Sequence, residues 1–209
     1  MVSNRFILIV AGALIAIGLL YEFSIHEAGD EGDMTIARVD QSRVKLDGTL
    51  GSASLRQLRG YLAANPQVQT LELGRMSGTI DVDATLDMAR WVRRQQLDTA
   101  LTAQSWIASG AVDLFVSGVD RSMTCGALVG VHAWAYTRGV DGTDIENPND
   151  YRHRAQISFL NDMGLDGDSF YWFKMRAAPP EDMHYMSVDE INRFRLTSEP
   201  LNCGAGTSA

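Results

Sequence analysis

The chain has no excess of basic residues. Lysine and arginine together number 18 against 26 aspartates and glutamates, and the two kinds are interspersed rather than gathered in blocks. A surface that binds nucleic acid needs a basic stripe that neutralises phosphates. We therefore expect no nucleic acid among the partners of this protein.

Metal-binding and phosphate-binding patterns are missing as well. His132, His153 and His184 include no pair with the short spacing of a zinc site on a helix or a hairpin. The sequence also contains no glycine-rich phosphate loop and no internal repeat. It therefore predicts neither a metal nor a cofactor.

An unbroken apolar run from Phe6 to Tyr21 is the first clear feature. Its length is near the lower limit for a membrane-spanning helix and is long for the core of a signal peptide. Arg5 precedes the run and acidic residues follow it, so the basic end is expected in the cytoplasm and the rest of the chain outside. No small-x-small cleavage site follows at the usual distance, which favours an uncleaved anchor over a signal sequence.

This run divides the chain into a membrane anchor or signal sequence, residues 1–26, and one exported domain, residues 27–209. With 45% apolar residues, the exported part of about 170 residues can bury a single core. Cys125 and Cys203 could form a disulfide that ties the C-terminal tail to this core. Two unpaired thiols are the alternative, because a sequence does not show whether two sulfurs meet.

Apolar periodicity predicts alternating strands and helices in the exported domain. Strands are expected at 34–40, 43–50, 70–73, 99–103 and 127–134, the first two joined by a tight turn. Helices are expected at 52–64, 82–97, 109–117, 153–163 and 187–194, the last opened by a Ser-x-x-Glu capping box. Strand, helix and strand in this rhythm predict an α/β fold of βαβ units with a mostly parallel sheet.

Two segments remain less defined. Residues 74–79 are expected to form a turn, and 138–151 a loop that is either a lid, an interaction arm or a plain connection. Beyond the loop, Tyr171, Trp172 and Phe173 are expected to be core or interface residues rather than a ligand platform.

Ser109 is the most informative candidate for chemistry. It stands between Ala108 and Gly110 at the start of an apolar helix, where its hydroxyl would lie near the positive end of the helix dipole. That position suits a nucleophile, but on this local pattern alone an ordinary N-cap serine is the favoured interpretation. The Gly-x-Ser-x-Gly pattern of α/β-hydrolases does not apply, because Ile107 replaces the first glycine. Asp113, one turn later, could face the same pocket, but a solvated position is the favoured expectation.

Several short motifs in order resemble the Clp-protease/crotonase-like superfamily, in particular its exported, periplasmic bacterial branch. The similarity covers roughly residues 43–196 and rests on order and spacing together. The motifs are Leu46-Asp47-Gly48-Thr49-Leu50, Leu71-Glu72-Leu73-Gly74-Arg75-Met76-Ser77-Gly78-Thr79, Ala108-Ser109-Gly110 with Gly118 further on, and Gly130-Val131-His132.

The resemblance implies a nucleophile, a base and an orienting acid. Ser109 falls on the position of the nucleophile and His132 on that of the general base, although His132 could also be a satisfied core histidine. Asp182 is the first choice for the acid that orients His132, with Glu181 second. Alignment on Ser187 instead places Met183 there, and both acids could be ordinary solvated loop residues.

The resemblance also implies an oxyanion hole. Related peptidases carry a Gly-Gly pair whose amides hold the negative oxygen, and only Gly78 of that pair remains here, because Ser77 precedes it. The amides of Gly78 and Gly110 are the expected donors. The alternative is that Ser77 and Gly78 simply make a turn, with weak or absent catalysis.

Taken together, these residues predict a serine hydrolase anchored in the bacterial inner membrane by a single pass, with its domain in the periplasm. A peptidase that acts on a peptide or protein is the first expectation, and the resemblance implies self-association. A catalytically inactive binding or scaffolding domain is the alternative. Acyl-CoA chemistry is not expected, because the domain would lie outside the compartment that holds this cofactor.

Overall fold

The computed structural model describes residues 31–136 and 140–204. The apolar run of residues 6–21 lies outside this part of the chain. Among the residues described, no helix is long and apolar enough to cross a membrane.

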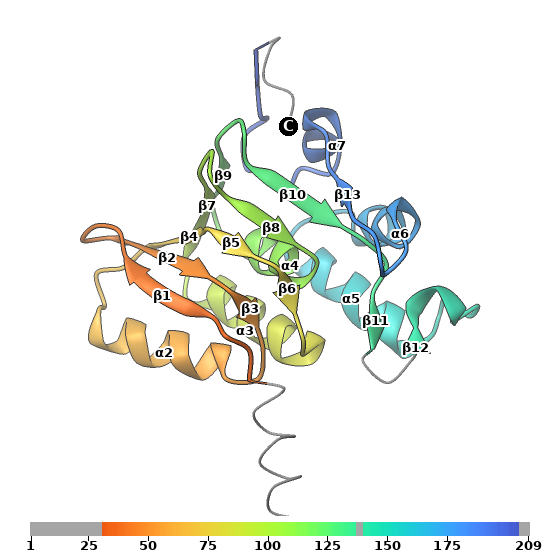
Figure 1. Ribbon diagram of the computed structural model, residues 1–209, viewed down its shortest axis with the longest axis horizontal. Coiled ribbons are helices and arrows are strands. Elements are labelled where there is room, and N and C mark those ends of the chain that lie inside the picture. Colours follow the sequence, from red (N-terminus) through yellow and green to blue (C-terminus); the bar gives the residue numbers. More distant parts are fainter. Residues whose placement is uncertain (1–30, 137–139, 205–209) are drawn as a thin grey trace, which may run out of the picture.

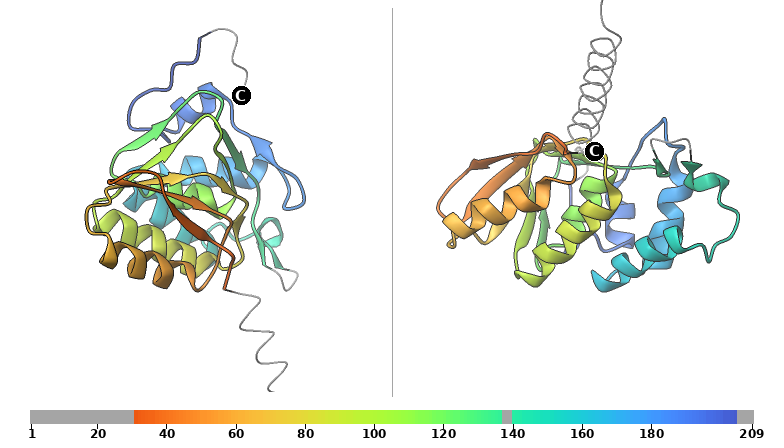
Figure 2. Two further views of the ribbon diagram at one scale, coloured as in Figure 1. Left: turned by 60° about the vertical axis from the view of Figure 1, so that its left-hand side comes forward. Right: turned by 90° about the horizontal axis from the view of Figure 1, so that it is seen from below.

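A five-stranded sheet forms one side of the molecule, and its strands follow in space the order β1-β2-β4-β7-β9. Strand β1 is antiparallel to β2, while the other neighbours are parallel. Helices α2 (Ser54–Ala64) and α3 (Val82–Arg94) pack against the same face of this sheet (Figures 1 and 2). The strands are β1 (Thr35–Arg38), β2 (Arg43–Asp47), β4 (Thr70–Leu73), β7 (Asp98–Leu101) and β9 (Arg121–Met123).

A second sheet has four strands in the order β13-β10-β8-β5, and it carries the candidate site. Strands β4, β7 and β9 of the first sheet are each followed, after a short connection, by a strand of this second sheet. The chain thus repeats one path: a strand in each sheet, then a helix. The strands are β5 (Arg75–Met76), β8 (Trp106–Ala108), β10 (Leu128–Val131) and the antiparallel β13 (His184–Tyr185).

The remaining elements surround this core. Strands β3 (Thr49–Leu50) and β6 (Gly78–Thr79) form a parallel pair, and β11 (Ala135–Tyr136) pairs with β12 (Val140–Asp141). Every residue of α4 (Gly110–Val116) is buried, which makes it the central helix. The other helices are η1 (Gly142–Asp144), α5 (Tyr151–Asp162), α6 (Gly167–Ala177) and α7 (Val188–Arg193).

Most of the long elements agree with the sequence predictions, and α6 is the exception, because no helix was predicted at 167–177. The first two strands pair as a hairpin, and Val44 and Leu46 of β2 are fully buried between partly exposed neighbours. Helix α7 begins with the predicted capping box, in which Ser187 and Glu190 bond reciprocally. Six of the strand pairings are parallel and three antiparallel, so the predicted parallel character is confirmed.

The short elements correct the predictions. The predicted turn at 74–79 contains β5 and β6, and strands β8 and β9 were not predicted at all. The strands consequently form two main sheets rather than one. A strand of two or three residues is too short to show an alternation of apolar and polar residues, so only its tertiary partners reveal it.

A disulfide joins Cys125 to Cys203, which resolves the alternative that the sequence left open. The tail beside it is held further by Asn192, whose side-chain amide donates to the carbonyl of Leu201 at 2.9 Å and accepts from its N–H at 2.7 Å. The C-terminal tail is therefore fixed to the core up to this bond.

Candidate active site

Ser109 occupies a strained turn between strand β8 and helix α4. Its backbone angles, φ 54° and ψ −128°, lie in a region that residues other than glycine rarely adopt. The side chain makes no capping hydrogen bond to α4, so the ordinary N-cap interpretation does not hold. A strand, a sharp turn at serine and a helix together form the geometry of a nucleophile elbow, reached here without the Gly-x-Ser-x-Gly pattern.

Two glycines make room for this turn. A Cβ on Gly78 would lie 2.8 Å from the Cβ of Ser109, and Gly78 itself has φ 128°. A Cβ on Gly110 would lie 2.4 Å from the Cγ2 of Thr79. Both predicted oxyanion residues therefore pack directly around the nucleophile position, and neither position can hold a larger residue without rearrangement.

His132 follows strand β10 and lines the same cavity as Ser109. Its Nδ1 lies 3.1 Å from the carbonyl oxygen of Pro180. Because a carbonyl only accepts, the proton of the neutral ring belongs on Nδ1, which leaves Nε2 unprotonated. His132, the residue expected to act as base, thus has the tautomer that a base needs, and no hydrogen bond joins it to Ser109 Oγ in the described structure.

Burial lowers the pKa of His132 below its ordinary value of 6.5. The hydrogen bond to Pro180 opposes this shift, the Lys174 ammonium lowers the pKa further, and Glu181 raises it. The imidazole is therefore neutral at physiological pH and able to accept a proton.

The predicted contact between Asp182 and His132 is absent from the described structure. Asp182 is exposed, and its carboxylate accepts the N–H of Met183 at 2.7 Å. Glu181 is exposed as well and acts on His132 only through its charge. The turn at 179–182 aims a backbone carbonyl at the imidazole, so Pro180 takes the orienting position expected for the acid.

A buried ion pair lies beside Ser109, and the sequence did not predict it. Lys174 Nζ of α6 lies 3.0 Å from Asp113 Oδ1 of α4, and each side chain is only 9% exposed. The expected solvated position of Asp113 is therefore wrong. Lys174 was missed because a lysine in an aromatic-rich helix ordinarily extends to water. The one available signal was the spacing of four between Phe170 and Lys174, which places both on one helix face.

These groups line a cavity of about 30 Å³. That space holds roughly one or two water molecules and no large side chain. Its walls combine Ser109 and His132 with both members of the ion pair. The lining residues are Thr79, Val82, Ser109, Gly110, Asp113, Val131, His132, Trp134, Gln156, Tyr171, Lys174 and Met175.

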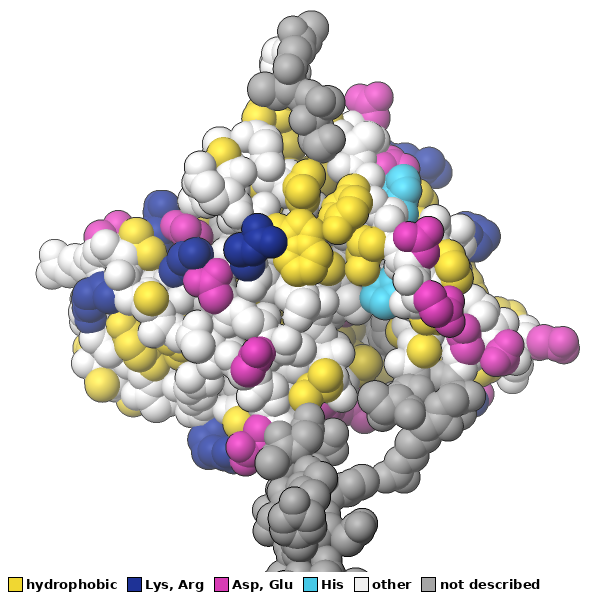
Figure 3. Space-filling view, viewed as in Figure 1, with side chains coloured by type: hydrophobic (Ala, Val, Ile, Leu, Met, Phe, Trp, Pro, Cys, Tyr) yellow, Lys and Arg dark blue, Asp and Glu magenta, His cyan; other side chains and the backbone are white. Residues whose placement is uncertain are grey.

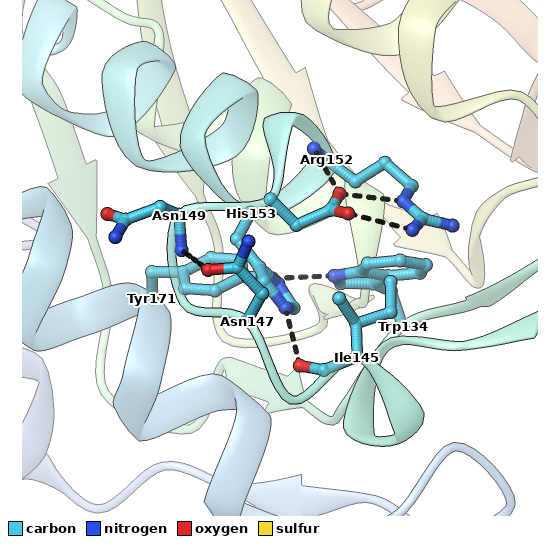
Figure 4. A network of polar contacts seen from close by, with 8 residues as sticks. Trp134, Ile145, Asn147, Asn149, Arg152, His153 and Tyr171 are labelled. Carbon is cyan, nitrogen blue, oxygen red and sulfur yellow. Dashed lines mark hydrogen bonds and ion pairs between the residues drawn. The ribbon is translucent and has the colours of Figure 1, made fainter.

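A polar network holds the wall formed by Trp134 and Tyr171 (Figure 4). Trp134 Nε1 donates to Tyr171 Oη at 2.7 Å, and the same oxygen lies 2.5 Å from His153 Nδ1. His153 Nε2 lies 3.2 Å from the carbonyl of Ile145. Because that carbonyl accepts, Nε2 carries the proton and Tyr171 donates to Nδ1. The described part of the predicted loop, residues 140–150, is thereby tied to α5 and α6, and Tyr171 is a core residue as predicted.

An apolar surface covers the outer face of the four-stranded sheet (Figure 3). Trp106 Nε1 donates to Tyr185 Oη at 3.0 Å, and the Arg75 guanidinium lies 5.7 Å from the Trp106 ring centre. Met183 lies over Gly130, where a Cβ would come within 2.7 Å of its sulfur. Trp106 of this surface lies only three residues before Ser109 in the chain.

Comparisons with known proteins bear on the fold. No family model and no curated protein matches the chain. Among solved structures, a ClpP1 mutant from Listeria monocytogenes has a TM-score of 0.53 and 14% identity over 80% of this chain and 95% of its own. An enoyl-CoA hydratase from Bacillus anthracis has a TM-score of 0.49 and 13% identity over 79% and 68%. A mutant of a membrane-bound stomatin-specific protease, solved with a substrate peptide, has a TM-score of 0.48 and 12% identity over 75% and 71%.

At these identities the similarity concerns the fold alone. The α/β fold of this chain, with its mixed sheets, resembles that of Clp-protease and crotonase-like proteins. The assignment of the site rests on its own geometry.

Proposed function

We propose that this chain, with its Clp/crotonase-like fold, is a serine hydrolase and specifically a peptidase, with Ser109 as nucleophile and His132 as general base. The strained and uncapped Ser109 carries this proposal. Backbone strain of this kind persists only where the surrounding structure enforces it, and it concentrates at active sites. Here it places a serine hydroxyl beside a cavity that also holds a neutral histidine.

The chemistry follows from these positions. Ser109 Oγ forms a bond to the carbonyl carbon of the substrate while its proton passes to His132 Nε2. The tetrahedral intermediate then collapses, the C–N bond breaks, and the imidazolium gives the proton to the departing amine. Water attacks the acyl-enzyme with the same base, which releases the acid and restores Ser109.

The oxyanion would be held by the amides of Gly78 and Gly110. Gly110 directly follows the nucleophile and is the first residue of α4, where an N–H has no acceptor within the helix. Ser77 stands in place of the family's other glycine. Its Oγ lies 2.8 Å from Thr49 Oγ1, so its hydroxyl is hydrogen-bonded to strand β3.

The group that orients His132 affects the expected rate of hydrolysis. Pro180 fixes the tautomer of His132 as an acid would, but a carbonyl dipole stabilises the imidazolium less than a carboxylate does. We therefore expect a hydrolase that is slower than one with a complete Ser-His-Asp triad.

We also propose that residues 6–21 anchor the protein in a bacterial inner membrane, with the domain in the periplasm. The disulfide between Cys125 and Cys203 supports this placement, because such bonds persist in oxidising compartments. Peptide substrates would then be exported or membrane-bound chains. Self-association stays a prediction that sedimentation of the detergent-solubilised chain would measure.

A fluorophosphonate probe tests the hydrolase proposal. Its phosphorus bonds to an activated serine oxygen and fluoride leaves, so labelling of the full chain in detergent reports the nucleophile. Labelling is expected for the native chain and for Ser122→Ala, an exposed serine of β9, and is expected to vanish in Ser109→Ala. A folded native chain that takes no label would overturn the proposal and favour the non-catalytic binding domain.

A further inference from the structure

The cavity beside Ser109 contains polar groups that the reaction above does not use. Gln156 of α5 is 8% exposed, Lys174 of α6 is 8% exposed and Asp113 of α4 is 6% exposed. All three line the cavity together with the nucleophile. Asp113 lies one helical turn after Ser109, which brings the ion pair close to the nucleophile position.

These groups have unused hydrogen-bonding capacity. The side-chain amide of Gln156 makes no hydrogen bond to any residue in the described part of the chain, although it has two donors and an acceptor. The Lys174 ammonium gives one of its three N–H groups to Asp113, and its other contact is the Phe170 ring at 5.5 Å. Because both residues line the cavity, their free donors and acceptor are available to a polar group that enters it.

The size and charge of the cavity limit the kinds of side chain that it can bind. A volume of about 30 Å³ excludes leucine and aromatic side chains. The charges of Lys174 and Asp113 cancel at 3.0 Å, so the pocket attracts neither an acid nor a base. Val82, Val131 and Met175 complete the wall with apolar groups. A small, uncharged side chain with a hydrogen-bonding group fits all three conditions.

We propose that this cavity binds the side chain of the substrate residue whose carbonyl Ser109 attacks, and that Gln156 and Lys174 select a small hydroxyl-bearing side chain, serine first. This inference rests on the proposed peptidase function. Gln156 and Lys174 are specificity-determining residues in this scheme, because they touch the substrate side chain and not the reacting bond. A pocket built to hydrogen-bond a hydroxyl discriminates strongly against an analogue that lacks it, since its own polar groups are then left unpaired.

Hydrolysis of acetyl-Ala-Ala-X-aminomethylcoumarin peptides by the full chain in detergent tests the inference, with X as serine, alanine, leucine or aspartate. We expect kcat/KM for serine to exceed that for alanine by about tenfold and that for leucine or aspartate by about a hundredfold. In Gln156→Met the ratio of serine to alanine is expected to fall towards one. Gln57→Met, the same change on the exposed face of α2, is expected to keep the native ratio.

The outcomes separate this inference from the proposed function. Fluorophosphonate labelling of Ser109 with equal or faster cleavage after leucine would overturn the serine pocket and leave the hydrolase standing. Labelling without any cleavage of the serine peptide would also overturn the pocket. A native serine preference that Gln156→Met leaves intact would remove Gln156 from the assignment. Absence of labelling would instead reject the hydrolase itself.

Discussion

The first sheet with α2 and α3 differs sharply from the region around the cavity. Glu72 of β4 has its ion-pair partner, Arg43, at 3.8 Å, and the Arg43 side chain is 41% exposed. Lys174 and Asp113 are closer, at 3.0 Å, and each of their side chains is only 9% exposed. The cavity region also contains the strained Ser109 and the unpaired Gln156. The cavity region thus combines a buried ion pair with a strained nucleophile position, as expected of a functional site. The other region has isolated cases only, since Arg93 Nε of α3 is buried without a partner among the described residues and Gln96 has φ 57°.

Breaking the two ion pairs should give the largest contrast. Lys174→Met leaves Asp113 buried without its partner, and we expect the free energy of unfolding to fall by about 3 to 5 kcal/mol. Arg43→Met, the matched change at the exposed pair, should lower it by at most about 1 kcal/mol. Urea denaturation measures both. Similar losses for the two variants would contradict the view that burial makes the cavity pair more important for stability than the exposed pair.

Adding a methyl group to a glycine should separate the regions again. Gly78→Ala meets Ser109 Cβ at 2.8 Å and requires a strained φ, so we expect a loss of about 2 kcal/mol and no fluorophosphonate labelling. Gly60→Ala in α2 meets nothing within 4 Å and should stabilise the protein by about 0.5 to 1 kcal/mol. A fully labelled Gly78→Ala variant would remove Gly78 from the oxyanion hole.

Relief of strain should give a smaller effect of opposite sign. Ser109→Gly removes the side chain that disfavours φ 54°, and we expect stability to rise by about 1 kcal/mol. Ser122→Gly in β9 has no strain to release and should destabilise by about 0.5 to 1 kcal/mol. Thermal unfolding compares the two, and a destabilised Ser109→Gly would argue against stored strain at the elbow.

The pH dependence of labelling should show the smallest shift. Because burial lowers the pKa of His132, the neutral base persists below pH 6.5 and is lost only as the pH falls through the lowered pKa. The labelling rate should therefore rise with pH to a plateau, with a midpoint below 6.5. His132→Gln should lose this titration. A midpoint above 6.5 would mean that another group accepts the proton of Ser109.

Much of the fold was predictable because its long elements carry their own signals. Strand β4 was predicted with its observed bounds, and α2 ends at Ala64, the last residue of the predicted helix. Helix α3 begins at Val82 as predicted and buries Leu86, Ala89 and Val92 at helical spacing. These patterns are local, since the period of apolar residues reports the face that each element buries.

Part of the candidate site was predictable too. The resemblance suggested Ser109, His132, Gly78 and Gly110, and the structure gathers all four around the elbow. Asp182 was expected at His132, but a turn of the chain brings the carbonyl of Pro180 there instead. Backbone carbonyls exist at every residue, so no sequence pattern marks the one that is used.

The sequence by itself determined the order of the main strands and helices, the position of the serine at the start of a central helix, and the expectation of an exported domain. Tertiary structure alone decided that short strands form a second sheet, that Cys125 meets Cys203, and that Lys174 closes a cavity against Asp113. The physical reason is distance along the chain. Periodicity and turn chemistry act over a few residues, whereas burial, ion pairing and the strain at Ser109 depend on groups that only the folded chain brings together.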